Sequence, residues 1–296
     1  MDVKQIIMLA LQLSILCTVL GFGLNATLAD IVYLFRHPRL LIRSLLAVYV
    51  LMPLVVVGLD AAFDFRPPVE ILLVALSISP LPPLLPRKEA GAAGQVSYGL
   101  GLMALLAIVS IVAVPLSLRV LSIVFDKQLR VDTAAIAGVV VKSTLAPLLV
   151  GVVIRRRLPA FARRIEKPVR MIGNVLLPAA VLVLVAGSLS AIWSAVGDGT
   201  VLAMAIVTMA GLAIGHVLGG PEPDHSVVLA LSTACRHPAI AVTIAAASYP
   251  NHPFGGMILL YLLVNAVVAI PYLKWQKRLS AARHIAPSPP AVKMPI

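Results

Sequence analysis

Charged residues are scarce in this chain of 296 amino acids. Asp, Glu, Lys and Arg make up 12% of it, where a soluble domain has about a quarter. Aromatic residues contribute 5%, and there are only two cysteines. The low charge excludes an ordinary cytosolic enzyme and a disordered protein, and the two cysteines exclude a secreted disulfide scaffold.

Apolar residues are abundant instead: 60% of the chain is hydrophobic and the mean hydropathy is +1.01. Because one bilayer crossing takes about 20 apolar residues, nine crossings use roughly 180 to 200 residues and leave room only for short loops and a tail. We therefore predict an all-α polytopic membrane protein. Its nine helices are expected at residues 3–28, 41–59, 69 onward with a proline-rich interruption, 96–124, 133–154, 171–196, 200–218, 226–247 and 256–273.

The chain carries a formal net charge of +12. The positions of its basic residues indicate membrane topology rather than nucleic-acid binding. Basic residues cluster beside the predicted spans, where Lys and Arg mark the cytoplasmic side. The clusters are Arg36, Arg39 and Arg43; a loop at 155–170; and Lys274, Lys277, Arg278 and Arg283. We expect the N-terminus outside, the C-terminus in the cytoplasm, and a plasma-membrane location, in a bacterium the inner membrane. The transmembrane domain covers 1–279, and 280–296 form a disordered cytoplasmic tail.

Prolines interrupt two of the predicted helices near mid-depth. The third contains Pro80, Pro82, Pro83 and Pro86, and the eighth is broken around Arg236–Pro238. Proline-interrupted spans at corresponding places in two halves indicate a transporter binding site. We interpret residues 1–130 and 131–279 as inverted repeats, the first lacking one helix. The alternative is that both interruptions are ordinary kinks in a packed bundle.

The break in the eighth helix has the residues of an anion site. An arginine at mid-bilayer costs about 2.5–3.5 kcal/mol on insertion scales, so Arg236 should face a polar interior. Its planar donor fork suits carboxylate, sulfate or phosphate, and the helix that starts at Pro238 presents free amides. Ser232, Thr233 and His237 are further candidates. Alternatively, Arg236 binds a backbone carbonyl or a buried carboxylate structurally, although the predicted spans place no Asp or Glu well inside.

Two further basic residues, Arg87 and Lys88, follow the proline cluster of the third helix. They either face the cavity opposite Arg236 or mark the cytoplasmic end of a short span, with Glu89 as a local partner. No metal-binding, P-loop or dinucleotide pattern is present, so we expect neither a metal nor a cofactor.

Several short motifs resemble the bile acid:sodium symporter family over most of the chain up to Arg278. They are Gly21-Phe22-Gly23-Leu24 with Leu34-Phe35-Arg36-His37-Pro38-Arg39, Leu51-Met52-Pro53, Val141-Lys142 with Pro147 and Gly151, and Ser232 to Ala239. The resemblance implies two inverted repeats, two unwound helices that cross at mid-membrane, and movement of organic anions by alternating access.

The sequence departs from the sodium-coupled members of that family. Those members carry a glutamate, then glutamine and asparagine, where this chain has Ser232, Arg236 and His237. They also carry a Ser-Asn pair in the third helix, where this chain has the proline-rich break with Arg87-Lys88. We therefore predict a secondary transporter of a small organic anion that lacks the usual sodium sites. Its transport is coupled to protons through His237, or it is facilitated transport or exchange.

Three alternatives stay open at this point. The first is an integral-membrane enzyme acting on a lipid-linked substrate, with His237 or His216 as its base. The second is a membrane sensor that keeps the fold without transporting. The third is a sodium-coupled symporter with unconventional ion sites.

Overall fold

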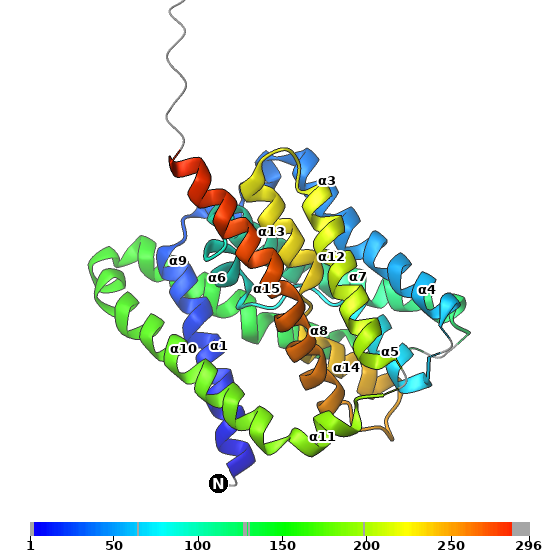
Figure 1. Cartoon of the computed structure of the whole chain (residues 1–296). Coiled ribbons are helices and arrows are strands. Elements are labelled where there is room, and N and C mark those ends of the chain that lie inside the picture. Colours follow the sequence, from blue (N-terminus) through cyan, green and yellow to red (C-terminus); the bar gives the residue numbers. More distant parts are fainter. Residues whose placement is uncertain (1–2, 64, 127–128, 130, 198, 286–296) are drawn as a thin grey trace, which may run out of the picture.

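The computed structural model describes residues 3–63, 65–126, 129, 131–197 and 199–285, and these ranges contain helices and no strands (Figure 1). Within them, eight helical segments are long and apolar enough to cross a bilayer. They are Gln5–Asn25, Pro38–Ala62, Val96–Val124, Thr133–Arg157, Pro159–Gly187, Thr200–Leu218, Pro223–Ser248 and Gly255–Ala282. A further apolar helix, α5 (Pro67–Ile78), has only 12 residues. The all-helical membrane fold is confirmed, whereas nine crossings stay a prediction.

Several crossing segments are built from more than one helix. The N-terminal helix α1 (Val3–Asn25) leads through α2 (Leu28–Ile31) and η1 (Tyr33–Arg36) to the second segment. The second segment consists of α3 (Pro38–Leu46), the π-helical turn η2 (Ala47–Leu51) and α4 (Met52–Ala62). The fourth consists of α8 (Thr133–Val140), η3 (Val141–Leu145) and α9 (Ala146–Arg157). Each π turn is followed within two residues by a proline, Pro53 or Pro147, which cannot donate a helical hydrogen bond.

Two predicted boundaries need correction. The basic stretch 155–170 was predicted as a loop, but α9 ends at Arg157 and α10 (Pro159–Gly187) begins two residues later. Pro159 starts the new helix, and Arg and Lys are good helix formers, so the charged residues continue the helices. The last helix, α15 (Gly255–Ile285), extends past the predicted end at Leu273 for the same reason. Residues 280–285 of the predicted tail are thus helical, and 286–296 lie outside the described residues.

The helices pack in two groups. In the first, α1 lies against α9 and α10. In the second, α12 (Thr200–Leu218) packs against α13 (Pro223–Ala234) and α15, and α5 packs against α14 (Pro238–Ser248). The long helix α7 (Val96–Val124) contacts both η3 and α5, and the short α11 (Leu189–Ser194) joins α10 to α15. In Figure 1 the start of α1 and the end of α15 lie at opposite ends of the bundle.

Asp30 links the short helix α2 to α7 through a hydrogen bond. Its Oδ1 accepts a hydrogen bond of 2.6 Å from Ser97 Oγ, and its Oδ2 accepts two of 2.7 Å from the backbone amide and hydroxyl of Thr27. Partial burial acts to raise the pKa of Asp30, but these hydrogen bonds and the charge of Arg155 hold the pKa below its ordinary value. The carboxylate is therefore a stable anchor for the segment that leads into η1 and α3.

Three glycines spaced four residues apart, Gly211, Gly215 and Gly219, bring α12 against α13. A Cβ on Gly215 would clash with the carbonyl oxygen of Leu229 and the Cα of Ala230, and one on Gly211 would meet the backbone of Ala234. Small residues at such positions let two helix backbones approach closely. This contact positions α13, which carries the second helix break.

Replacing Gly215 with alanine should therefore destabilise the protein by about 1–3 kcal/mol, the usual cost of overpacking a tight contact. The measurement is thermal unfolding in detergent, followed by the fluorescence of Trp193 and Trp275. Gly58→Ala is the matched control, because nothing lies within 4 Å of a Cβ built there. A Gly215→Ala protein as stable as Gly58→Ala would contradict the close-packing argument.

The two interrupted helices meet at their breaks. Helix α5 ends at Ile78, Ser79 is extended, and α6 (Leu85–Ala90) begins after Pro80, Pro82 and Pro83, with Pro86 in its first turn. Helix α13 ends at Ala234, and α14 begins at Pro238. The amide of His237 donates a 2.8 Å hydrogen bond to the carbonyl of Pro80. Helix α5 contacts α14 and α6 contacts α13, and the place where the two breaks meet is called the helix crossing below.

Candidate functional site at the helix crossing

The backbone groups freed at the second break have partners from α15. The amide of Arg236 donates to Tyr261 Oη at 2.8 Å, and the carbonyl of Ala234 accepts from Asn265 Nδ2 at 2.9 Å and from Tyr261 Oη at 3.3 Å. Non-helical backbone at membrane depth is tolerated only when it is satisfied in this way or lines a cavity. Tyr261 and Asn265, one helical turn apart, therefore fix the backbone conformation of the break.

The side chain of Arg236 joins the two halves of the crossing. It is 1% exposed; its Nη1 donates to the carbonyl of Ser79 at 3.1 Å, and its Nη2 lies 3.5 Å from the carbonyl of Val48. The carbonyl of Val48 lacks a helical donor because Pro53 stands five positions on and the amide of Met52 bonds to Ala47 instead, and the carbonyl of Ser79 lies just past the end of α5, where the chain is extended before Pro80. The prolines thus create acceptors that the guanidinium satisfies.

Several buried polar atoms beside the crossing have no hydrogen-bond partner among the described residues. They are Arg236 Nε, both ring nitrogens of His237, and Oε2 of Glu89. His237 is 5% exposed and Glu89 is 2% exposed. Buried polar atoms are nearly always paired, so unpaired ones at one place indicate a site that a proton, water, ion or ligand completes.

Glu89 is a buried carboxylate that the sequence analysis did not predict. The sequence predicts it only as a local partner of Arg87 and Lys88, but it is buried, and its Oε1 accepts a 2.7 Å hydrogen bond from Ser232 Oγ. Gly99 on α7 leaves room for it, since a Cβ there would clash with Oε2. Within the described part of the chain Glu89 forms no ion pair.

The other predicted residues differ in their surroundings. Thr233 is buried and donates to the carbonyl of Leu229 in its own helix, at 2.7 Å. The ammonium of Lys88 reaches Cys235 Sγ at 3.9 Å, so it lies at the crossing, whereas Arg87 on the same helix is exposed. Of the six predicted residues, Arg236, His237, Ser232, Thr233 and Lys88 are therefore close to the second break.

Tyr261 and Asn265 are polar residues of this region that sequence analysis missed, whereas Tyr98 follows the first break and was a weaker candidate. Tyr98 is buried beside Glu89, and its hydroxyl lies 2.8 Å from Ser44 Oγ. An asparagine four residues after a tyrosine within an otherwise apolar span was the signal available for Asn265. Among the described residues, no group of three or more His, Cys, Asp and Glu side chains is arranged to hold a metal ion.

A cavity of about 580 Å³ lies between the two helix groups. Its lining comes from α1, α10 and α11 on one side, and from the start of α5 and of α15 on the other. Arg66 and Pro68 mark the α5 side, about 18 Å of helix away from the break at Ser79. Its volume is in the range of small-molecule sites.

These features define an integral membrane protein in which two interrupted helices meet at their breaks, beside buried polar groups. The chain belongs to the sodium bile acid symporter family, whose family model matches residues 12–195. Members of this family are transporters rather than enzymes. The matched range contains the first helix break and ends before the second. No curated protein matches the chain.

Proposed function

We propose that the protein is a secondary transporter that moves a small organic anion through the helix crossing by alternating access. The observation that carries the proposal is the set of buried, unpartnered donors at the second break, Arg236 Nε and the ring of His237. A carboxylate or sulfonate that reached them would add hydrogen bonds to a cation whose two terminal nitrogens already contact the carbonyls of Ser79 and Val48.

The position of the large cavity supports a route to this site. It lies at the end of the bundle where α5 begins, and α5 leads from there to the crossing. The lining includes Arg66, so an anion entering the cavity passes a cation first. Relative movement of the α1–α9–α10 group against the rest would open and close this route.

The coupling ion in this proposal is a proton carried by Glu89. An ionised carboxylate buried without a cationic partner costs several kcal/mol, so Glu89 is neutral in this conformation. The groups around it are Lys88 on its own helix, Tyr98 on α7, and Ser232 and Cys235 on α13. A movement that separates α6 from α13 would hydrate Glu89 and release its proton. This assigns to Glu89 the role that the sequence suggested for His237.

Transport should not depend on sodium, since the fixed charge of Arg236 at the crossing repels a cation. The assay uses purified protein in liposomes and a set of labelled anions: taurocholate, benzoate and a short keto acid. We expect at least one to accumulate above protein-free vesicles, and the rate to change less than twofold when potassium replaces sodium. A fivefold or greater loss without sodium would overturn the coupling proposal, and accumulation of none of the anions would count against the proposed substrate class.

A further inference from the structure

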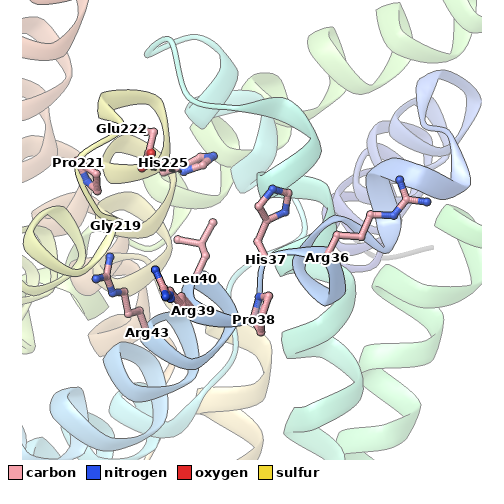
Figure 2. A pocket seen from close by; sticks show the side chains of 10 residues that line it. All are labelled: Arg36, His37, Pro38, Arg39, Leu40, Arg43, Gly219, Pro221, Glu222 and His225. Atoms are coloured by element: carbon pink, nitrogen blue, oxygen red, sulfur yellow. Dashed lines mark ion pairs between the residues drawn. The ribbon is translucent and has the colours of Figure 1, made fainter.

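A second cavity, of about 500 Å³, lies where α3 begins and α12 turns into α13 (Figure 2). One wall is the end of η1 and the first turns of α3, and the other is the turn at 219–222 with His225 of α13. His225 lies seven residues before Ser232, about 10 Å along the helix. This cavity is therefore separate from the helix crossing.

Arginine side chains dominate the lining. Arg39 and Arg43 are exposed, lie one helical turn apart on α3, and extend toward the turn between α12 and α13, whereas Arg36 extends to the opposite side (Figure 2). Two guanidiniums one helical turn apart place two donor forks near each other, and such forks recognise phosphate bidentately.

The carboxylate of Glu222 also lines the cavity, and His225 engages it. Glu222 Oε2 lies 3.6 Å from His225 Nδ1, while His225 Nε2 lies 2.9 Å from the hydroxyl of Tyr33. The ring of His225 is thus held between Glu222, on its own wall, and Tyr33 of η1, the short helix whose end forms the other wall. One carboxylate against three arginines leaves the lining with a surplus of positive charge.

The backbone adds to this positive potential. Helix α3 begins at Pro38 after His37, whose side chain makes no capping hydrogen bond. The ring of His37 turns back instead, with Nδ1 2.9 Å from the carbonyl of Tyr33. The uncapped first turn of a nine-residue helix therefore faces the cavity between the arginines and His37. On the opposite wall, Gly220 has φ +99°. The turn lies close to Arg43 at this point, since a Cβ built on Gly220 would be 3.2 Å from Arg43 Nη1.

We propose that this cavity is a binding site for a phosphate group, held by Arg39, Arg43 and the first turn of α3. Such a group has two sources: the headgroup of an anionic phospholipid at the membrane surface, or a soluble phosphate compound. In both cases the ligand lies between α3 and the start of α13, one half of an interrupted helix. The proposal does not depend on the identity of the transported anion.

The test measures thermal stability of the full chain with two probes. In detergent, inorganic phosphate and pyrophosphate are titrated; in phosphatidylcholine nanodiscs, phosphatidic acid is added as a fraction of the lipid. We expect Tm to rise with at least one probe, because a ligand that binds the folded state stabilises it. The double variant R39Q/R43Q should weaken the apparent affinity at least tenfold. R163Q/R164Q, which removes two exposed arginines from α10, should leave it within twofold.

A response to phosphate or pyrophosphate identifies a soluble ligand, and a response to phosphatidic acid alone identifies a lipid headgroup. Either result supports the site if R39Q/R43Q loses it. No rise in Tm with any probe, or equal responses of the two double variants, overturns the proposal. Because Arg39 and Arg43 lie outside the crossing, anion uptake by R39Q/R43Q in the absence of phosphate reports separately on the proposed transport.

Discussion

Arg236→Ala is expected to reduce anion uptake at least 30-fold. Removing one partner of a buried, hydrogen-bonded charge pair costs about 2–5 kcal/mol, and each 1.4 kcal/mol is tenfold in affinity. The same substitution leaves the carbonyls of Ser79 and Val48 without their donor. Uptake is measured in liposomes with whichever labelled anion the wild type accumulates.

A second variant separates binding from folding. Arg236→Lys keeps the charge but has no planar fork, so it cannot satisfy the carbonyl of Ser79 and bind an anion with the same geometry. We expect it to run as a single peak in size-exclusion chromatography, to unfold within a few degrees of the wild type, and to lose uptake at least tenfold. Arg163→Ala, an exposed arginine on α10, is the control. Folded Arg236→Lys protein with wild-type uptake would remove Arg236 from the site.

Glu89→Gln is expected to abolish accumulation driven by a pH gradient and to spare exchange. Glutamine keeps the hydrogen bond from Ser232 and the volume of the side chain, but it cannot take up or release a proton. One proton per anion allows about tenfold accumulation for one pH unit, since one unit corresponds to 1.36 kcal/mol. In the variant the ratio of internal to external anion should fall to one, while counterflow stays within about threefold of the wild type.

Two control variants make this result specific. Glu166→Gln makes the same chemical change in α10, where Glu166 lies 3.5 Å from Arg170, and it should accumulate like the wild type. His237→Gln tests the residue that the sequence favoured for proton coupling, and it should weaken anion binding but keep the dependence on the gradient. If anion accumulation no longer depends on the pH gradient in His237→Gln but still depends on it in Glu89→Gln, the coupling role belongs to His237.

The sequence predicted the fold class, most of the apolar helices and the position of both interruptions. These predictions succeed because they depend on local physics: apolar length for a span, and the missing amide of proline for a break. The predicted range 200–218 coincides with α12. The same local reasoning failed at 155–170, where charge suggested a loop although arginine and lysine continue a helix well.

Glu89 shows why the site was harder to predict than the fold. In the sequence it follows Arg87 and Lys88 and looks like one member of a surface charge cluster. Whether a residue in such a cluster is exposed depends on which helix packs over it. Here α7 and α13 cover α6, so Glu89 is buried while Arg87, two residues earlier, is exposed.

Composition and local chemistry are enough to predict that this protein is embedded in a membrane, that two of its helices are interrupted, and that an arginine lies at one interruption. Each follows from the composition or from a single residue's chemistry. Three features depend on tertiary packing instead: the interruptions meet, Arg236 donates to carbonyls 157 and 188 positions away, and the buried carboxyl of Glu89 accepts a hydrogen bond from Ser232. Those contacts join residues far apart in the chain, and no local pattern encodes which distant backbone group a side chain will reach.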